Sequence, residues 1–175
     1  MEKEVKMILD MMPILSGAVD KLDFDFTYQI AADSIVASVF ADVDFEKPMR
    51  VQGYVKNMAG YMVLYADVKL PYATACARCA EPVYSELEIS FEKDIATGDV
   101  SRDNDDYIFI EDKKLDLVSP VEEEIMLEMP SKTLCREDCK GLCPTCGKNL
   151  NFGKCDCEST PTDPRFDVLD SLLGD

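Results

Sequence analysis

Six of the eight cysteines in this chain lie within 23 residues, CREDCKGLCPTCGKNLNFGKCDC, from Cys135 to Cys157. The other two, Cys76 and Cys79, lie in the sequence CARC. The chain has no histidine, so a metal site would have to use thiolates or carboxylates. Two cysteines joined by a tight turn supply half of a tetrahedral thiolate site, and four such pairs would suffice for two zinc sites.

The order of the four pairs leaves open how they combine. The candidate ligands are Cys76, Cys79, Cys135, Cys139, Cys143, Cys146, Cys155 and Cys157. CPTCG is a strong half-site, because Pro144 opens the turn and Gly147 lets the backbone bend away after it. As a hypothesis, we favour a local site formed by the last four cysteines. The first four would then join CARC to CREDC and tie the tail to the strand region. In the alternative partition, CREDC completes the local site instead.

Other chemistries fit these thiols less well. CARC and CPTC match the spacing of redox-active pairs, but a thioredoxin-like site requires a βαβ unit and a helix that starts at the first cysteine, and neither is evident. Ligation of an iron–sulfur cluster is chemically possible. We expect one or two structural zinc ions. Four cations are placed to offset the charge of the thiolates: Arg78, Lys140, Lys148 and Lys154.

The N-terminal residues give no sign of export. Their longest uncharged run, Met11 to Val19, contains a proline and is far shorter than a membrane span. A basic start followed by an apolar run and a small-residue cleavage site is also missing. We therefore expect a cytoplasmic protein with no membrane partner. In that reducing compartment, clustered cysteines are more often metal ligands or catalytic thiols than structural disulfides.

The formal net charge of −17 is distributed unevenly. Residues Glu81 to Glu128 contain sixteen acidic and four basic residues, a net charge of −12. The stretch from Cys135 to Cys157 carries +1 before any thiolate is counted. The acidic part of the chain should repel nucleic acid and attract basic proteins.

The first part of the chain is rich in expected strands. Phe24 to Ile30 and Val83 to Phe91 alternate apolar and polar residues, as half-buried strands do. Three further segments are apolar on both faces or nearly so: Ser34 to Asp44, Arg50 to Lys56 and Tyr61 to Lys69. We expect an α+β fold that is mainly antiparallel β, with a sheet that is curled or closed into a barrel-like structure.

Turns and loops connect these strands. The sequence NMAG, Asn57 to Gly60, predicts a hairpin turn in which Gly60 takes a positive φ. The stretch from Ala96 to Tyr107 is too polar to pack and predicts a mobile acidic loop.

The first of two expected helices follows the strands. In SPVEEEIMLEMP, Ser119 is a candidate N-cap, Pro120 fits the first helical position and Glu122 completes a capping box, so we predict a helix over residues 120–129. Its acidic start would be solvated and stabilised by the helix dipole. Three apolar residues would face the core: Val121, Ile125 and Met129.

The expected strands and helices, together with the cysteine-rich stretch, divide the chain into three predicted parts. Residues 1–134 form the mainly β body with the helix, residues 135–158 form the cysteine-rich tail, and residues 159–175 form a short terminal helix. The sequence TDPRFDVLDSLLGD is amphipathic at helical spacing, and this helix docks either on its own domain or on a partner.

The groups that catalysis would need are largely missing. The chain has no histidine base, no glycine-rich phosphate loop, and no serine or cysteine nucleophile in a recognisable setting. A zinc ion held by four cysteines leaves no position for water. We expect neither an enzyme nor a small-molecule substrate.

The layout resembles that of the DUF177 proteins, also called the YceD family. The resemblance rests on CARC after a mostly β region, the acidic stretch leading to DLVSPVEEEIMLEMP, the six-cysteine tail and the closing DPRFDVLDSLL. The tail is similar to the cysteine-rich form seen in Gram-positive relatives. Members without that tail still carry a C-x-R-C pair, matched here by Cys76, Arg78 and Cys79.

The resemblance implies a bacterial or organellar factor, without enzymatic activity, that is needed for normal accumulation of the large-subunit ribosomal RNA. Together with the charge distribution, it suggests that the acidic body binds a basic ribosomal protein or a large-subunit assembly intermediate. The zinc-binding tail would then either touch rRNA or simply complete the fold, so contact with rRNA could be indirect. Two alternatives remain open. One is a zinc module that binds RNA directly, and the other is a thiol redox sensor that expels zinc on oxidation.

Overall fold

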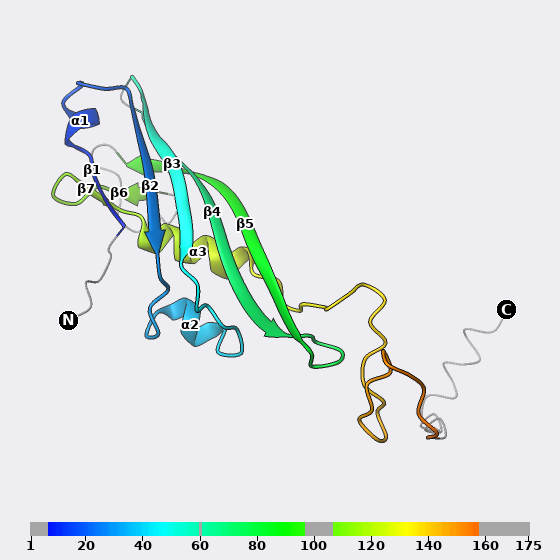
Figure 1. Ribbon diagram of the computed structural model, residues 1–175. Helices are drawn as coiled ribbons and strands as arrows, with labels where there is room; N and C mark the ends of the chain where they lie inside the picture. Colours follow the sequence, from blue (N-terminus) through cyan, green and yellow to red (C-terminus); the bar gives the residue numbers. More distant parts are fainter. Residues whose placement is uncertain (1–6, 60, 97–106, 158–175) are drawn as a thin grey trace, which may run out of the picture.

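The computed structural model describes residues 7–59, 61–96 and 107–157 (Figure 1). Its largest element is a five-stranded sheet in the order β2-β3-β4-β5-β6. The strands are β2 (Lys21–Tyr28), β3 (Met49–Met58), β4 (Tyr61–Ala75), β5 (Pro82–Ala96) and β6 (Tyr107–Phe109). The pairs from β2 to β5 are antiparallel, and β6 runs parallel to β5. The expected α+β class with mainly antiparallel strands is confirmed.

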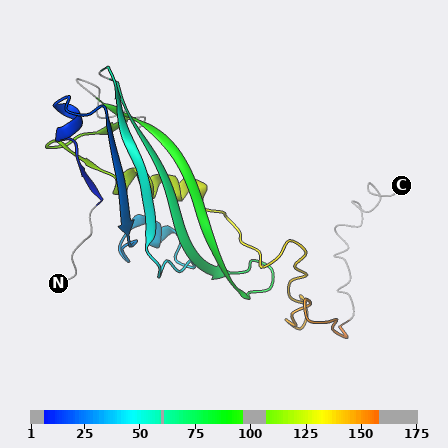
Figure 2. The same cartoon turned by 45° about the horizontal axis from the view of Figure 1, so that its top comes forward.

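The sheet is open, so the barrel-like alternative is wrong. β2 and β6 lie at opposite ends of the strand order and do not pair with each other. Both views show long strands that bend together around one side of the molecule (Figures 1 and 2). Closure would require edge strands of comparable length to pair, but β2 has eight residues and β6 has three. Helix α3 (Val118–Glu128) packs against β5 instead, and its apolar residues share one core with those of the sheet.

The hairpin between β3 and β4 is confirmed. Met58 pairs with Tyr61, so the connection consists of residues 59 and 60. Ala59 adopts a positive φ of 57°. The sequence predicted a positive φ at the neighbouring Gly60. Gly60 lies outside the described residues, as do the acidic loop at residues 97–106 and the terminal helix expected in residues 159–175.

A second, smaller sheet was not expected from the sequence. β1 (Ile8–Asp10) pairs antiparallel with β7 (Lys114–Asp116), and the short helix α1 (Met12–Leu15) follows β1. The apolar residues Met7, Leu9 and Met11 alternate and are all buried. This pairing anchors the start of the described chain next to the segment that leads into the helix beginning at Val118.

The expected strand at Ser34 to Asp44 is wrong. Its first half forms the helix α2 (Ile35–Val39), and the Ser34 hydroxyl accepts a hydrogen bond from the backbone N–H of Ala37 at 3.1 Å. The β-branched side chains of this segment favour a strand, but the serine cap and the burial of Val36 in the core outweigh that local preference.

Helix α3 (Val118–Glu128) begins two residues before the predicted start. The carboxylate of Asp116 accepts from the backbone N–H of Val118 at 2.8 Å, whereas Ser119 lies inside the first turn and donates to the Glu123 side chain at 3.2 Å. The predicted capping box is therefore wrong. The predicted core face is confirmed, since Val121, Ile125 and Met129 are all buried.

The main core lies between the sheet and these helices. Its members alternate along the strands and continue onto α3, and they include Val51, Val55, Leu64, Val68, Ile89, Phe91, Val121 and Ile125. Glu122 is buried as well, at 9% exposure, and its Oε1 has no hydrogen-bond partner among the described residues. The expectation of a fully solvated acidic helix start is wrong at this position. None of the described helices has the length and apolar character needed to cross a bilayer.

Candidate metal centre

The first cysteine pair lies at the tip of the longest hairpin. β4 ends at Ala75 and β5 begins at Pro82, so CARC forms the connecting loop. The Cys76 N–H donates to the Glu81 carbonyl at 2.8 Å, and the Ala80 N–H donates to the Cys76 carbonyl at 2.9 Å. Ala80 has a φ of 58°. The loop is thus a tight knuckle that requires a left-handed residue four positions after its first cysteine.

The pair CPTC forms a second knuckle with the same hydrogen bonds. The Cys143 N–H donates to the Lys148 carbonyl at 2.8 Å, and the Gly147 N–H donates to the Cys143 carbonyl at 2.9 Å. Gly147 has a φ of 72°, as expected for the residue where the backbone turns away. Ala80 occupies the equivalent position in the first knuckle, which explains why only the second knuckle looked like a strong motif in the sequence.

The eight thiols form two groups of four, within each of which all sulfur atoms lie within 4.8 Å of one another. The staple cluster consists of Cys76, Cys79, Cys135 and Cys139. The local cluster consists of Cys143, Cys146, Cys155 and Cys157. This grouping is the favoured partition and not the alternative. That the two clusters bind metal remains a prediction.

The spacing of the sulfur atoms fits a tetrahedral zinc ion. In the staple cluster, Cys76 and Cys139 Sγ are 3.9 Å apart, and Cys79 and Cys135 Sγ are 3.6 Å apart. Four sulfur atoms about 2.3 Å from one zinc ion lie about 3.8 Å from one another in a regular tetrahedron. All eight cysteines are free rather than disulfide-bonded. Both clusters therefore offer the donor set of a closed, structural site.

Backbone N–H groups favour the ionised form of selected thiols. The Cys135 N–H donates to Cys76 Sγ at 3.3 Å, and chiefly for this reason the pKa of Cys76 is lowered to about 6. The N–H groups of Cys146 and Thr145 lower the pKa of Cys143 to about 6 in the same way. Burial, followed by the neighbouring thiols, raises the pKa of Cys135 to about 12. A bound metal ion would displace the protons that remain on the other thiols of each cluster.

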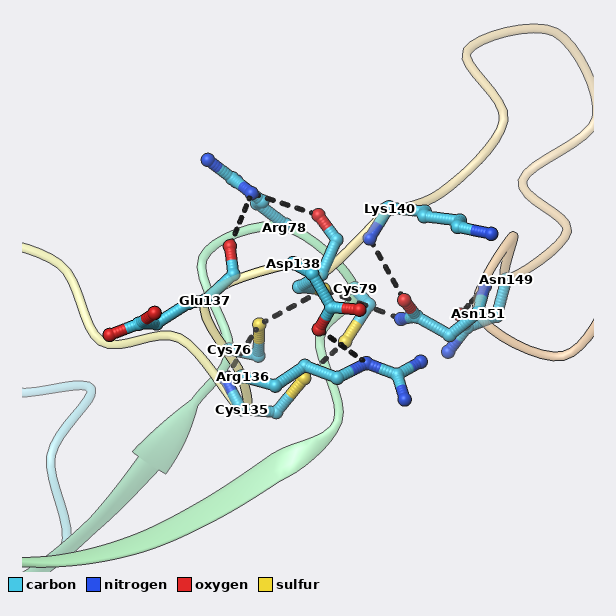
Figure 3. Close-up of polar contacts among 11 residues, drawn as sticks. Cys76, Arg78, Cys79, Cys135, Arg136, Glu137, Asp138, Lys140, Asn149 and Asn151 are labelled. Atoms are coloured by element: carbon cyan, nitrogen blue, oxygen red, sulfur yellow. Dashed lines mark hydrogen bonds and ion pairs between the residues drawn. The ribbon is translucent and has the colours of Figure 1, made fainter.

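Arg78 joins the hairpin tip to the tail (Figure 3). Its guanidinium donates to the carbonyl of Cys139 at 2.9 Å and to that of Glu137 at 3.3 Å. Its own carbonyl accepts from the Leu142 N–H at 3.1 Å. From the sequence, Arg78 is expected to offset thiolate charge, but in the structure its guanidinium binds backbone carbonyls of the tail. Lys148 also donates to a carbonyl, that of Lys154, at 2.8 Å.

Two asparagines at the clusters were missed in the sequence. Asn151 donates from Nδ2 to Cys139 Sγ at 3.3 Å, which is the main cause of the lowered pKa of that thiol. Asn149 donates to the Glu81 side chain at 3.3 Å. Both lie in GKNLNFGK, where asparagines are expected in a polar turn. The contacts of Asn151 with Cys139 and of Asn149 with Glu81 follow only from the folded tail.

Four acidic residues of the body lie on the outer face of β5. Residues of that strand alternate between the buried side, with Ile89, Phe91 and Ile95, and the outer side. The acidic residues on the outer side are Glu86, Glu88, Glu92 and Asp94. We call these four residues the acidic row. Lys69 pairs with Glu88 at 2.5 Å, and the hydroxyl of Tyr61 contacts Asp94.

Several known proteins are similar to this chain. An uncharacterised protein of Mycobacterium tuberculosis is 30% identical over 124 residues, which cover 69% of this chain and 59% of that protein. The uncharacterised protein YlbN of Bacillus subtilis is 27% identical over 161 residues, which cover 87% of this chain and 90% of YlbN. A chloroplastic protein of Zea mays, named large ribosomal RNA subunit accumulation protein YCED homolog 1, is 29% identical over 143 residues, covering 63% of this chain and 49% of the relative.

The chain thus spans about 59% of the length of the mycobacterial relative. No solved structure matches this chain. The family model described as large ribosomal RNA subunit accumulation protein YceD matches residues 64–173. Because this match extends over more than half of the chain and contains both cysteine clusters, we conclude that the chain belongs to the YceD family.

Proposed function

We propose that this chain is a non-enzymatic, cytoplasmic factor for large-subunit rRNA accumulation and ribosome assembly. It binds a basic ribosomal protein or an assembly intermediate through its acidic surface, and it holds two structural zinc ions. The description of the family model and the name of the Zea mays relative support a role connected with the large-subunit rRNA. The mechanism is inferred from this chain's own surface.

The acidic row is the observation that carries the proposed binding mode. It presents four carboxylates on one side of one strand, and of these Glu86 and Glu92 have no ion-pair partner among the described residues. Such a row repels phosphates and attracts basic protein segments, with an affinity that decreases as salt screens the charges. The curved sheet holds the row rigid, because the opposite side of β5 is packed into the core.

Zinc would act here as a structural element. The staple cluster joins the hairpin tip to the segment that follows α3, and the local cluster closes the tail on itself. In each cluster, the four cysteines would fill every position of a tetrahedral ion, so the chemistry supplied is cross-linking of the chain rather than catalysis. The tail would then be held at a defined position at the end of the β4–β5 hairpin.

The binding mode is tested with purified protein, individual basic large-subunit ribosomal proteins and naked rRNA. We expect salt-sensitive binding to a basic protein and little binding to the rRNA. The double variant Glu86→Lys/Glu92→Lys should abolish that binding. A matched control, Asp42→Lys/Glu46→Lys, makes the same change in net charge at two exposed positions away from the row. Equal loss in both variants would reject the row as the docking surface.

The metal sites are tested by quantifying zinc in protein purified gently under reducing conditions. We expect two zinc ions per chain and one after disruption of either cluster by Cys76→Ser or Cys143→Ser. Wild-type protein without bound zinc would reject the sites. A coloured protein with iron and inorganic sulfide would indicate a cluster in their place.

A second candidate function is direct RNA binding by the tail. Phe152 is 80% exposed in the turn between the two halves of the local cluster, where it could stack on an unpaired base. Tight binding of naked rRNA that is lost in Phe152→Ala would favour this function over docking of a basic protein.

A further inference from the structure

The turn at residues 149–151 places Asn149 and Asn151 beside the staple cluster (Figure 3). It belongs to the local cluster by position, because it is flanked by Cys146 and Cys155. Its side-chain contacts, however, lead to the staple cluster. Asn151 donates to Cys139 Sγ at 3.3 Å and accepts from the Lys140 N–H at 2.8 Å.

The backbone of this turn is fixed at several points. The Asn151 N–H donates to the Asn149 side chain at 3.0 Å, and the Leu150 N–H donates to the Gly141 carbonyl at 2.9 Å. Leu142 and Asn149 form an isolated β-bridge. The orientation of the Asn151 amide is therefore set by the pairing of residues 141–142 with 149–150, which flanks the CPTC knuckle of the local cluster.

A second set of contacts joins the clusters through the three residues between Cys139 and Cys143. The Leu142 N–H donates to the Arg78 carbonyl at 3.1 Å. Gly141 packs so closely that a Cβ there would lie 3.0 Å from the same carbonyl oxygen. Ordering of either cluster thus restricts the chain that forms the other.

We propose that the two clusters bind metal cooperatively and that Asn151 is the positioning residue that carries the coupling. The inference rests on the proposed metal sites and goes beyond them. A metal ion in the local cluster orders the segment between Cys146 and Cys155, and this places the Asn151 amide on Cys139. The N–H···S bond stabilises the thiolate that the staple cluster contributes to its own metal ion.

Cooperativity is measured by titrating the reduced, metal-free full chain with Co²⁺ in the presence of a competing chelator. Tetrahedral cobalt thiolates absorb in the visible and near-ultraviolet range, so binding is followed directly. Removal of the local site by Cys155→Ser/Cys157→Ser should lower the affinity of the staple cluster by about 10- to 100-fold. Because coupling is reciprocal, Cys76→Ser/Cys79→Ser should lower the affinity of the local cluster by the same factor.

Asn151→Ala tests the route of the coupling. This variant should still bind two ions, with a staple-cluster affinity about 10- to 100-fold below that of the wild type. Disruption of the local site in the Asn151→Ala background should add little further loss. Asn151→Asp keeps an oxygen for the Lys140 N–H but replaces the donor to Cys139 with a carboxylate, so its loss should be at least as large. Phe152→Ala, at the exposed residue that follows the turn, should bind both ions as the wild type does.

The possible outcomes separate this inference from the function on which it rests. Wild-type protein that binds no Co²⁺ would reject the metal sites themselves. Two bound ions whose affinities are unaffected by disruption of the other cluster would reject the coupling and leave the sites intact. Coupling that persists in Asn151→Ala would overturn the role assigned to this residue.

Discussion

The body and the tail of this protein are held together by different means. In the described part of the body, up to residue 134, the buried side chains are mainly apolar, and most of them form one core under the curved sheet. In the described tail, residues 135–157, the buried residues are Cys139, Gly141 and Cys143, while Leu142 and Phe152 are exposed at 41% and 80%. The body can therefore fold by burial of apolar surface, whereas the tail depends on its thiols.

Removal of the metal should produce the largest difference between the two regions. Binding of a structural zinc ion contributes about 10–16 kcal/mol in small zinc-dependent folds, and the tail has no apolar core to replace it. A strong zinc chelator under reducing conditions should abolish hydrogen-exchange protection at the amides of Leu142, Cys143 and Gly147. Protection in β3, β4 and β5 should persist. Loss of protection in both regions together would show that they form one cooperative unit.

Gly53→Ala should damage the body and spare the tail. An added Cβ would lie 2.0 Å from the backbone oxygen of Tyr65 and 2.9 Å from Cζ of Phe24, so backbone atoms would have to move. We expect a loss of about 3 kcal/mol in the free energy of unfolding of the body. Chemical denaturation followed by far-UV circular dichroism measures this loss. Zinc content should remain at the wild-type level, and Gln52→Ala on the same strand serves as the control.

Glu122→Gln should stabilise the body in a pH-dependent way. Burial and, secondarily, the charge of Asp116 raise the pKa of the Glu122 carboxyl. The native state therefore holds this proton more tightly than the unfolded state does, and the associated stability is present at low pH and lost as the pH rises through the raised native pKa. Glutamine cannot ionise and should add about 1 kcal/mol at pH 7, with no gain at pH 4.

Thermal denaturation of both proteins at these two pH values measures the effect of Glu122→Gln. Glu128→Gln, at an exposed position of the same helix, should leave the stability unchanged at both pH values. A Glu122→Gln variant that is less stable than the wild type at pH 7 would show that the carboxylate has a partner in the native protein.

The smallest expected effects distinguish the two knuckles of the clusters. Ala80 and Gly147 occupy equivalent positions with φ of 58° and 72°. Ala80→Gly removes backbone strain and should strengthen zinc binding by about 0.5 kcal/mol, whereas Gly147→Ala should weaken it by about 1 kcal/mol. Competition with a chelator measures both. Effects of the same sign in the two variants would contradict the equivalence of the knuckles.

Features that depend on nearby residues could be predicted from the sequence. The hairpin between β3 and β4, the parity of β5 and the core face of α3 all follow from apolar spacing and turn residues. The C-x-x-C pairs were recognised in the same way, although Ala80 concealed how closely the first knuckle matches the second. The order of the pairs left two groupings open, and the favoured one is found in the folded chain.

Other features depended on contacts between distant segments. Ile35, Val36 and Val39 favour a strand locally, yet this segment is a helix because Ser34 caps it and Val36 packs in the core. Ser119 looked like the N-cap of α3, but the Val118 N–H donates to Asp116 instead. Asp116 is the last residue of β7, whose position is set by its pairing with β1. Glu122 looked solvated because its position relative to the sheet could not be read from helical periodicity.

The sequence by itself determined that this is a β-rich acidic protein with four cysteine pairs, because periodicity, charge and ligand spacing are local properties of the chain. Only the tertiary structure decided that the sheet stays open, that Arg78 binds the carbonyls of the tail and that Asn151 reaches Cys139. Arg78 meets the carbonyls of Glu137 and Cys139 across 59 and 61 residues of sequence, and Asn151 meets Cys139 across 12. No local pattern specifies these contacts, because they form only when the chain folds back and the tail lies against the tip of the β4–β5 hairpin. Whether the edge strands β2 and β6 meet is likewise decided by the curvature of the whole sheet.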